Sequence, residues 1–484
     1  MGNDVDGEVC HIAAGVTGGS VIAAAGCGKT ETIARSVLLC SGRRLILTHT
    51  HAGLEALSKR LLKHKVPAER YRLDTIAGWC LRFVLAFPVR SAISVKVPRK
   101  NDEWTAVYQG VARLIASGAI DEVLQASYRG VFVDEYQDCT SEQHEVVRGL
   151  GQRLPTCVFG DPLQSIFDFA NQIPVNWQAD VFPVFPKVGQ LTTPWRWKNA
   201  GNDELAEWLK DVRQTLEGGT SLSLDAKTPS CVLWSQLPTK EEIRIQAIAK
   251  QCLAAMKGVG TSQNLIVIGD GASSGSRSAL AKRLSQQHFS TIEPVNCKEL
   301  YKAAKDLDGA PAEKRWPVVL KFVSDCMTGS EQAELKAAVL SRASGGKKGV
   351  TKFGANLISA AHEASESGSD LGVLAFLQTI DRHDGVRVYR REMLYAMCAA
   401  LRSKAAGNVD TLAEGVWQAQ NRIRHAGRKF GKYSVGSTLL VKGLEFDHAV
   451  IAETSQFDRK DWYVALTRAA ARVHIVSASK QLLA

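Results

Sequence analysis

The sequence lacks the cysteine spacings that mark metal-binding and disulfide-rich proteins. Its eleven cysteines stand singly between Cys10 and Cys398, and no Cys-x-x-Cys pair occurs. This excludes the common zinc and iron–sulfur spacings and indicates reduced thiols. The sequence also lacks an apolar run long enough to span a bilayer, and it lacks an N-terminal signal-peptide pattern. We therefore expect a cytoplasmic protein with no membrane partner.

Acidic residues are the minority among the charged side chains. Lys and Arg number 60 and Asp and Glu number 49, so the formal net charge is +11. A basic surplus fits a nucleic-acid partner, because Lys and Arg release counterions from the phosphate backbone. Many basic proteins bind no nucleic acid, so the charge alone leaves both readings open. Length suggests about three domain-sized units.

A small-residue segment lies between a predicted strand and a predicted helix. Ser20–Ala24 is apolar enough for a buried strand of a parallel sheet, and Glu31–Leu39 has a helical pattern. Backbone N–H groups of such a turn point at phosphates; Lys29 would neutralise them, and the Thr30 hydroxyl would hold Mg²⁺. Ala23 stands where the strict phosphate-loop pattern has Gly, so a simple turn of an α/β domain is the alternative. The expected ATP contacts here are Ala25, Gly26, Gly28, Lys29, Thr30 and Glu31.

A second chemical site follows another predicted strand. Val131–Val133 is an apolar run that ends in Asp134 and Glu135. Ligands of parallel sheets gather at the carboxyl ends of the strands, so Asp134 is placed to hold Mg²⁺. Glu135 could orient or deprotonate the attacking water. Asp138, in contrast, could be only a helix cap.

Seven further segments occur in the order found in one family. Together with the phosphate loop, they resemble the motifs of UvrD/Rep-type superfamily 1A DNA helicases. The segments are Leu47–Ala52, Leu73–Ile76, Asp134–Asp138, Gly160–Phe167, Leu191–Lys198, Lys442–Asp447 and Tyr463–Ala469. The resemblance implies an α/β fold with two RecA-like P-loop motor domains, 1A and 2A, and mainly helical insertions, 1B and 2B. The implied ranges are 1–84 and 129–188 for 1A, 85–128 for 1B, 189–298 and 431–484 for 2A, and 299–430 for 2B.

The resemblance also implies roles around the nucleotide. Gln164 would contact the γ-phosphate. Arg196 and Arg468 would reach the phosphoryl group from the second motor domain as arginine fingers, a task that suits the permanently charged guanidinium. An aromatic side chain, here Trp195, would stack on the adenine. The remaining implied nucleotide contacts are Gly443 and Glu445.

On the nucleic-acid side, the resemblance implies a single strand whose bases stack on aromatic rings. Stacking of this kind is worth about 1–3 kcal/mol per base and tolerates any sequence. The residues that stand at matching positions are Thr48, His49, Thr50, His51, Phe167 and Phe169. The two phenylalanines could instead fill the core. The basic clusters Arg387–Arg391 and Arg422–Lys432 could line a DNA path or form a solvated surface.

The sequence departs from this family at three places. The family has a Gln about twenty residues before the loop lysine, but Met1–Thr17 contains none, although Glu8 and His11 lie nearby. Leu439 replaces a histidine of the fifth motif. Asp168–Asn171 lacks an arginine that often contacts DNA. Loss of these contacts would weaken DNA binding or strand separation while leaving ATP hydrolysis intact.

The sequence is consistent with three functions to different degrees. The first is an ATP- and Mg²⁺-dependent helicase or translocase that moves 3′→5′ on single-stranded or partly duplex DNA. The second is a DNA-sensing regulatory ATPase that controls a partner nuclease in antiviral defence, similar to the helicase-like subunit of the Gabija system. The third is a P-loop signalling switch, which Leu47–Ala52 and Gly160–Phe167 argue against.

Overall fold

The computed structural model describes residues 5–98, 100–166, 173–271, 274–294, 297–343, 353–426 and 430–483. The chain divides into two compact units. Unit 1 comprises Met1–Leu222, Asp458–Ala471 and Leu483–Ala484, and unit 2 comprises Ser223–Phe457 and Arg472–Leu482. No helix in the described ranges is long and apolar enough to cross a bilayer.

Unit 1 contains a six-stranded sheet whose neighbouring strands are all parallel. The strand order is β3-β2-β4-β5-β1-β6. The strands are β1 Gly18–Ala23, β2 Arg44–Thr48, β3 Tyr71–Thr75, β4 Gly130–Val133, β5 Thr156–Gly160 and β6 Lys187–Leu191. The α-helices are α1 Val5–Gly15, α2 Lys29–Leu39, α3 His51–Lys63, α4 Ile76–Ala86, α5 Pro88–Ser91, α6 Asn101–Ala116, α7 Asp121–Ser127, α8 Ser141–Gly151, α9 Trp195–Asn199, α10 Asp203–Glu217 and α21 Arg459–Leu466. Shorter helical turns are η1 Ala68–Arg70, η2 Tyr136–Asp138, η3 Pro162–Gln164 and η4 Trp177–Val181.

Helices cover both faces of this sheet because each central strand is apolar on both faces. In β4, Val131 and Val133 join one buried cluster, while Phe132 between them joins the other. This is the two-residue alternation of a strand. The Phe132 ring meets the Phe159 ring edge to face on the second side, with centroids 5.7 Å apart. The sheet is therefore a buried central layer, as its continuous apolar strands predict.

The strand order decides where the polar loops of unit 1 meet. β5 lies between β4 and β1, and all three run in the same direction. The segments that follow them therefore emerge at one edge of the sheet. These segments are the phosphate loop after β1, Asp134 after β4 and Asp161 after β5.

Unit 2 contains a second six-stranded sheet, in the order β10-β13-β9-β14-β15-β8. β10, β13, β9 and β14 are parallel neighbours, and β15 is parallel to β8. The strands are β8 Val232–Gln236, β9 Leu265–Gly269, β10 Phe289–Thr291, β13 Tyr433–Ser437, β14 Phe446–Ala452 and β15 Ala469–Ser477. The helices that accompany them are α11 Glu241–Met256, α12 Ser274–Arg283, the turn η5 Ser285–Gln287 and α20 Thr438–Val441. Leu222–Ser223 (β7) and Gln481–Leu483 (β16) form a separate two-stranded sheet.

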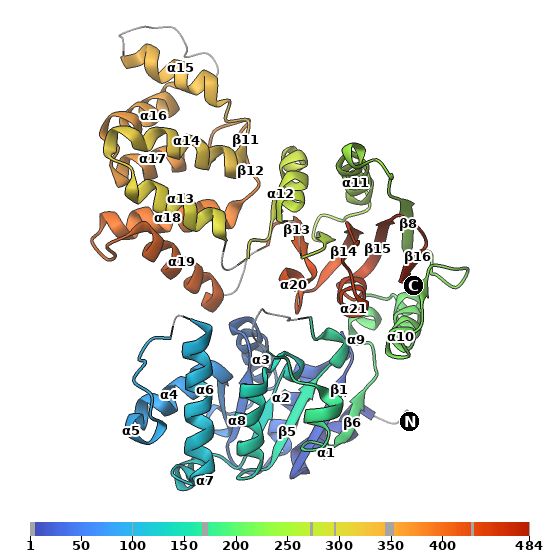
Figure 1. The fold of residues 1–484 in the computed structure, drawn as a ribbon. Coiled ribbons are helices and arrows are strands. Elements are labelled where there is room, and N and C mark those ends of the chain that lie inside the picture. The colour runs from blue at the N-terminus through green and yellow to red at the C-terminus, as the bar shows by residue number, and fades with distance from the viewer. Residues whose placement is uncertain are drawn as a thin grey trace. The chain divides into compact units, whose positions relative to one another are not determined.

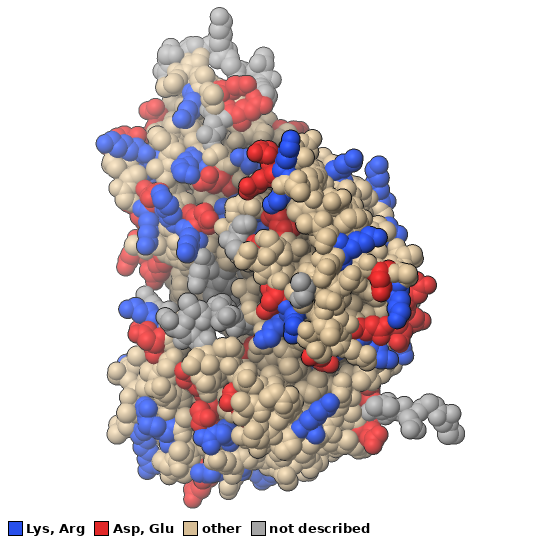
Figure 2. Space-filling model, turned by 45° about the vertical axis from the view of Figure 1, so that its right-hand side comes forward, with Lys and Arg blue, Asp and Glu red and all other residues tan. Residues whose placement is uncertain are grey.

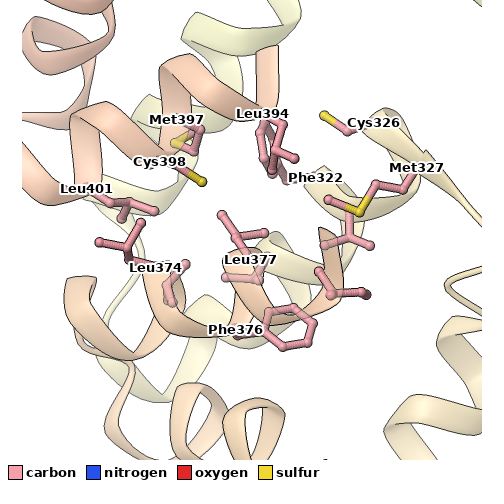
Figure 3. Close-up of a cluster of buried hydrophobic side chains, with 14 of the residues drawn as sticks. Phe322, Cys326, Met327, Leu374, Phe376, Leu377, Leu394, Met397, Cys398 and Leu401 are labelled. Atoms are coloured by element: carbon pink, nitrogen blue, oxygen red, sulfur yellow. The ribbon is translucent and has the colours of Figure 1, made fainter. Parts of the chain in front are cut away.

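A group of helices, drawn yellow to orange in Figure 1, lies between β10 and β13 in the chain. Its elements are α13 Lys298–Gly309, the turn η6 Ala312–Lys314, α14 Arg315–Cys326, α15 Gln332–Ala343, α16 Ala355–Ser367, α17 Asp370–Asp381, α18 Arg391–Ala405 and α19 Leu412–Ala426. The short antiparallel strands β11 Met327–Thr328 and β12 Arg387–Val388 join it at one point. Its own apolar core includes Phe322, Leu377, Leu394 and Leu401, whose side chains converge from α14, α17 and α18 (Figure 3).

The structure confirms the expected α/β class with two parallel-sheet domains of six strands each. It also confirms the strands expected at Ser20–Ala24 and Val131–Val133 and the helix that follows the phosphate loop. The two compact units are delimited differently from the ranges implied for 1A, 1B, 2A and 2B, and those boundaries stay predictions. All eleven cysteines lie in the described ranges and carry free thiols.

Candidate nucleotide site

The phosphate loop turns through two glycines with positive φ. Gly26 has φ +71° and Gly28 has φ +78°, in the left-handed region that favours glycine. A side chain would also collide here, because a Cβ on Gly26 would lie 2.8 Å from the ring of Trp197. Gly28 is the residue before α2, which begins at Lys29. The first N–H groups of α2 therefore remain available for an anion, and the helix dipole favours one.

Lys29 lies against the two carboxylates that follow β4. Its Nζ atom is 3.2 Å from Asp134 Oδ1 and 2.6 Å from Glu135 Oε1. Burial opposes the charge of Lys29, but the two carboxylates outweigh it and hold the pKa of Lys29 above its ordinary value. Burial raises the pKa of Asp134, and the charge of Lys29 opposes that shift. The contact joins the loop after β1 to the end of β4, as the strand order requires.

A chain of amide and carboxylate contacts runs from Glu135 to Gln164. The Gln137 amide nitrogen donates to Glu135, and its Oε1 accepts from the backbone N–H of Asp161 at 3.0 Å. Asp161 has no exposed side-chain surface. Its Oδ2 accepts from Gln164 Nε2 at 2.8 Å. The acidic motif and the Gln164 amide are thus parts of one buried network.

Both predicted arginine fingers lie in unit 1, together with the phosphate loop. Arg468 is fully buried: its Nε donates to Val464 O at 2.9 Å, and its Nη2 donates to Thr467 Oγ1 at 3.0 Å and to Gln164 Oε1 at 3.3 Å. Arg196 Nη1 donates to Thr467 O at 2.5 Å. Two arginines distant in sequence therefore share one partner residue beside Gln164. Their catalytic role stays a prediction.

Trp195 has a partner that the sequence interpretation missed. Its Nε1 donates to Oδ2 of Asp6 at 2.7 Å, and Thr193 Oγ1 lies 3.5 Å from the other carboxylate oxygen. The Trp195 side chain also borders the loop, because a Cβ on Gly28 would lie 3.2 Å from its Cδ1. A signal for Asp6 exists in the sequence: it precedes the buried Cys10 by four positions, so it is an acid on the apolar face of α1.

Arg213 and Tyr463 are two more residues that sequence reasoning did not assign. Both are buried in unit 1 beside Asp161. Arg213 could have been singled out, because in α10 it stands four positions after Leu209 and three before Leu216. Those leucines are buried, so Arg213 is a cation on an apolar helix face.

The residues predicted to contact DNA are in mixed environments. Thr48 is buried at the end of β2, while Thr50 caps α3 by accepting a hydrogen bond from Gly53 N at 3.0 Å. His49 and His51 are half-buried, and His49 Nε2 lies 3.2 Å from Cys139 Sγ. The two phenylalanines proposed for stacking, Phe167 and Phe169, lie outside the described residues.

Three more residues predicted to contact the nucleotide are Glu31, Gly443 and Glu445. The Glu31 carboxylate contacts Arg60 of α3, whose Nη1 lies at 3.2 Å, and the imidazole of His64, the residue that follows α3. Gly443 and Glu445 lie in unit 2 on the exposed turn between α20 and β14, where Gly443 has φ +78°. Their nucleotide roles stay predictions.

On the face drawn in Figure 2, Lys and Arg side chains are interspersed with Asp and Glu. Within Arg387–Arg391, Arg390 is buried, and its Nη2 lies 2.7 Å from Glu293 Oε2. Arg390 therefore forms a buried ion pair with Glu293 and does not belong to a solvated basic surface. Part of Arg422–Lys432 lies outside the described residues.

The donor set at the loop fits a nucleotide with a magnesium ion. Mg²⁺ prefers oxygen ligands and is bound in such sites by one or two carboxylates or hydroxyls together with substrate phosphates. Thr30 at the start of α2 and Asp134 after β4 supply a hydroxyl and a carboxylate at the same sheet edge. Lys29 Nζ already places a positive charge against Asp134.

Comparison with known proteins connects part of unit 1 to helicases. Residues 101–178 match the family described as UvrD/REP helicase N-terminal domain. That segment contains Asp134, Glu135 and Gln164. No curated protein matches the sequence. The solved structure of PRRSV helicase is similar at 11% identity and a TM-score of 0.33, with 97% of this chain aligned. The aligned part covers 54% of that helicase chain, so this chain spans about half its length. The family match thus makes a segment within unit 1 similar to the N-terminal domain of UvrD/REP helicases.

Proposed function

We propose that this chain hydrolyses ATP and uses the energy to move 3′→5′ along single-stranded DNA, unwinding duplex ahead of it. One observation carries the proposal: Lys29 Nζ lies 3.2 Å from Asp134 Oδ1 and 2.6 Å from Glu135 Oε1. A cation for the phosphates, a carboxylate for the metal and a second carboxylate for the water are what phosphoryl transfer requires. The UvrD/REP match over residues 101–178 directs this chemistry to nucleic acid.

Each residue at the site has a separate role in ATP hydrolysis. The N–H groups of the loop and Lys29 bind the phosphates. Thr30 and Asp134 would hold Mg²⁺, which would neutralise charge on the phosphate oxygens. Glu135 orients the attacking water and accepts its proton. Gln164 and the two arginines beside Thr467 stabilise the charge of the transferring group.

The nucleic-acid path is proposed for the surface formed by the segments after β2 and β5. Of the residues predicted to contact DNA, His49 and His51 are half-buried, and Phe167 and Phe169 are the proposed stacking residues. Stacking needs no base-specific contact, which suits an enzyme that moves along any sequence. Thr50 would act indirectly, by capping the helix that carries His51.

The test is an ATPase assay of the full chain with and without single-stranded DNA, joined to unwinding of a duplex with a 3′ tail. We expect DNA to stimulate hydrolysis and the 3′-tailed duplex to be separated faster than a 5′-tailed one. Glu135→Gln keeps the shape of the side chain but removes the base, and hydrolysis should fall about 100-fold or more. Glu145→Gln, which removes an exposed carboxylate paired with Arg148 on α8, is the matched control and should hydrolyse normally. ATP hydrolysis that ignores DNA would contradict the proposal and favour a signalling switch.

A regulatory ATPase that senses DNA and controls a partner nuclease is the second candidate. Two motif positions favour it: Thr48 is buried, and Leu439 stands where UvrD/Rep-type helicases have a histidine, so neither side chain is expected to bind DNA strongly. This candidate predicts DNA-stimulated hydrolysis without strand separation. Co-purification with a nuclease encoded by a neighbouring gene would then distinguish it from a free translocase.

A further inference from the structure

Arg213 of α10 is a buried cation whose partners come from three parts of unit 1. Only 9% of its side chain is exposed. Its Nη1 atom lies 2.9 Å from Asp161 Oδ1 and donates to the Tyr463 hydroxyl at 2.7 Å. Its Nη2 atom lies 2.9 Å from Glu217 Oε1. The same guanidinium nitrogen therefore touches the segment after β5 and helix α21.

Asp161, the first of these partners, also contacts Gln164. The Asp161 carboxylate is wholly buried and accepts from Arg213 and from Gln164 Nε2, the latter at 2.8 Å. A buried carboxylate is costly without a paired cation. Arg213 supplies that cation, and so keeps Asp161 able to fix the direction in which the Gln164 amide points.

Tyr463, the second partner, also contacts the phosphate loop. The Tyr463 hydroxyl oxygen accepts from Arg213 Nη1 and also from the backbone N–H of Ala25 at 3.1 Å. The Arg213 guanidinium also stacks over the Tyr463 ring, 5.2 Å from its centroid. N–H groups of phosphate loops bind phosphate oxygens. A nucleotide on the loop would compete with the Tyr463 hydroxyl for the Ala25 N–H.

We propose that Arg213 is a positioning residue that transmits occupancy of the phosphate loop to Gln164 through Tyr463 and Asp161. This inference rests on the proposed function, because it assigns a role within the same nucleotide site. When phosphate takes the Ala25 N–H, the Tyr463 hydroxyl loses one of its two donors and Arg213 readjusts. Asp161 shares the same guanidinium nitrogen, so the Gln164 amide responds.

The kinetic test compares Arg213→Met and Arg213→Lys with the wild-type full chain. Lys29 and the loop N–H groups bind the nucleotide in every variant, so KM for ATP should change less than about threefold. We expect kcat of Arg213→Met to fall about 10- to 100-fold, as when an interaction needed only in the transition state is lost. Arg213→Lys keeps the charge beside Asp161 but lacks the fixed fork, so it should restore thermal stability and only part of kcat.

A double-mutant cycle tests the route through Tyr463. Tyr463→Phe removes the hydroxyl that bridges Arg213 and Ala25. If Arg213, Tyr463 and Ala25 act as one path, Tyr463→Phe should lower kcat. The kcat of the double variant with Arg213→Met should then be no lower than that of Arg213→Met alone. Independent, multiplying effects of the two substitutions would contradict the path.

A structural role is separated from transmission by a matched control. Arg315 of α14 is another buried arginine, held by Asp370 at 2.6 Å in unit 2. Arg315→Met should lower the melting temperature as Arg213→Met does but leave kcat unchanged. If Arg213→Met lowers only the melting temperature, and kcat per folded molecule equals that of wild type, Arg213 is merely structural and the proposal fails.

Hydrogen exchange gives a readout that needs no hydrolysis. A non-hydrolysable ATP analogue should slow amide exchange over residues 160–166 in the wild-type chain and not in Arg213→Met or Tyr463→Phe. Slowing that persists in both variants would overturn the proposal. Failure of the wild-type chain to bind the analogue would instead overturn the proposed function itself, and the role of Arg213 with it.

Discussion

The indole Nε1 of Trp195 lies 2.7 Å from Oδ2 of Asp6, although the two residues are 189 positions apart. Asp6 is buried, so this bond fixes the indole plane beside the phosphate loop. The region before the loop lacks the glutamine that the resemblance to UvrD/Rep-type helicases predicts for adenine recognition. Asp6 lies in that region, and its carboxylate accepts hydrogen bonds but cannot donate one.

Asp6→Ala should weaken nucleotide binding by freeing the indole. A hydrogen bond to a charged group contributes about 1.5–3 kcal/mol, and the half-exposed indole favours the lower value. We expect KM for ATP to rise about tenfold with little change in kcat, measured by steady-state hydrolysis. Asp6→Asn keeps an acceptor and should stay close to wild type. Glu8→Ala, an exposed acid on the same helix, is the control, and an unchanged KM in Asp6→Ala would refute the role.

Lys29→Met should abolish hydrolysis and also destabilise unit 1. Asp134 is buried, and the substitution leaves it beside Glu135 without the cation. Breaking a buried ion pair costs about 3–5 kcal/mol, and partial exposure of Glu135 reduces this. Mg²⁺ can replace the lost charge, so it should raise the melting temperature of Lys29→Met more than that of wild type. Asp134→Asn added to Lys29→Met should remove this effect; equal Mg²⁺ shifts in all three proteins would show that Asp134 holds no metal.

Arg468→Lys should slow hydrolysis without loss of nucleotide binding. The guanidinium contacts Val464, Thr467 and Gln164 at once, and an ammonium group cannot hold that geometry. We expect kcat to fall about 100-fold or more while binding of a fluorescent ATP analogue stays within threefold, since arginine fingers act mainly on the transition state. Arg459→Lys, on the exposed start of α21, should behave as wild type. Comparable loss in both variants would point to damage of the helix.

The protein should lose stability as the pH falls below about 6.5. Burial lowers the pKa of His144, His448 and His474 below the ordinary value. Because the unfolded chain then binds protons before the native state does, the stabilisation is present above the unfolded pKa and is lost as the pH falls through the native pKa. Urea unfolding at pH 7.5 and 5.5 measures this. His144→Gln retains a partner for Tyr136 and should show a smaller loss; an identical loss would exclude His144 as a contributor.

The sequence alone predicted which residues form the candidate nucleotide site. Lys29 and Asp134 were placed together because each follows an apolar strand, and parallel strands end at one edge of a sheet. That reasoning needs only local pattern and strand direction. The contacts of Lys29 with Asp134 and Glu135 agree with it.

Tertiary structure decided which distant side chains support that chemistry. Asp6 and Arg213 belong to no motif; Asp6 contacts Trp195, 189 positions away, and Arg213 contacts Tyr463, 250 positions away. Each was visible in sequence only as a charge on an apolar helix face, a pattern that shows the need for a partner but not its identity. The partner of a buried charge depends on which elements pack together, and chain topology sets that packing. Thus the sequence alone predicted where ATP chemistry would occur, and only the fold decided which buried ions and hydroxyls connect the phosphate loop to Gln164.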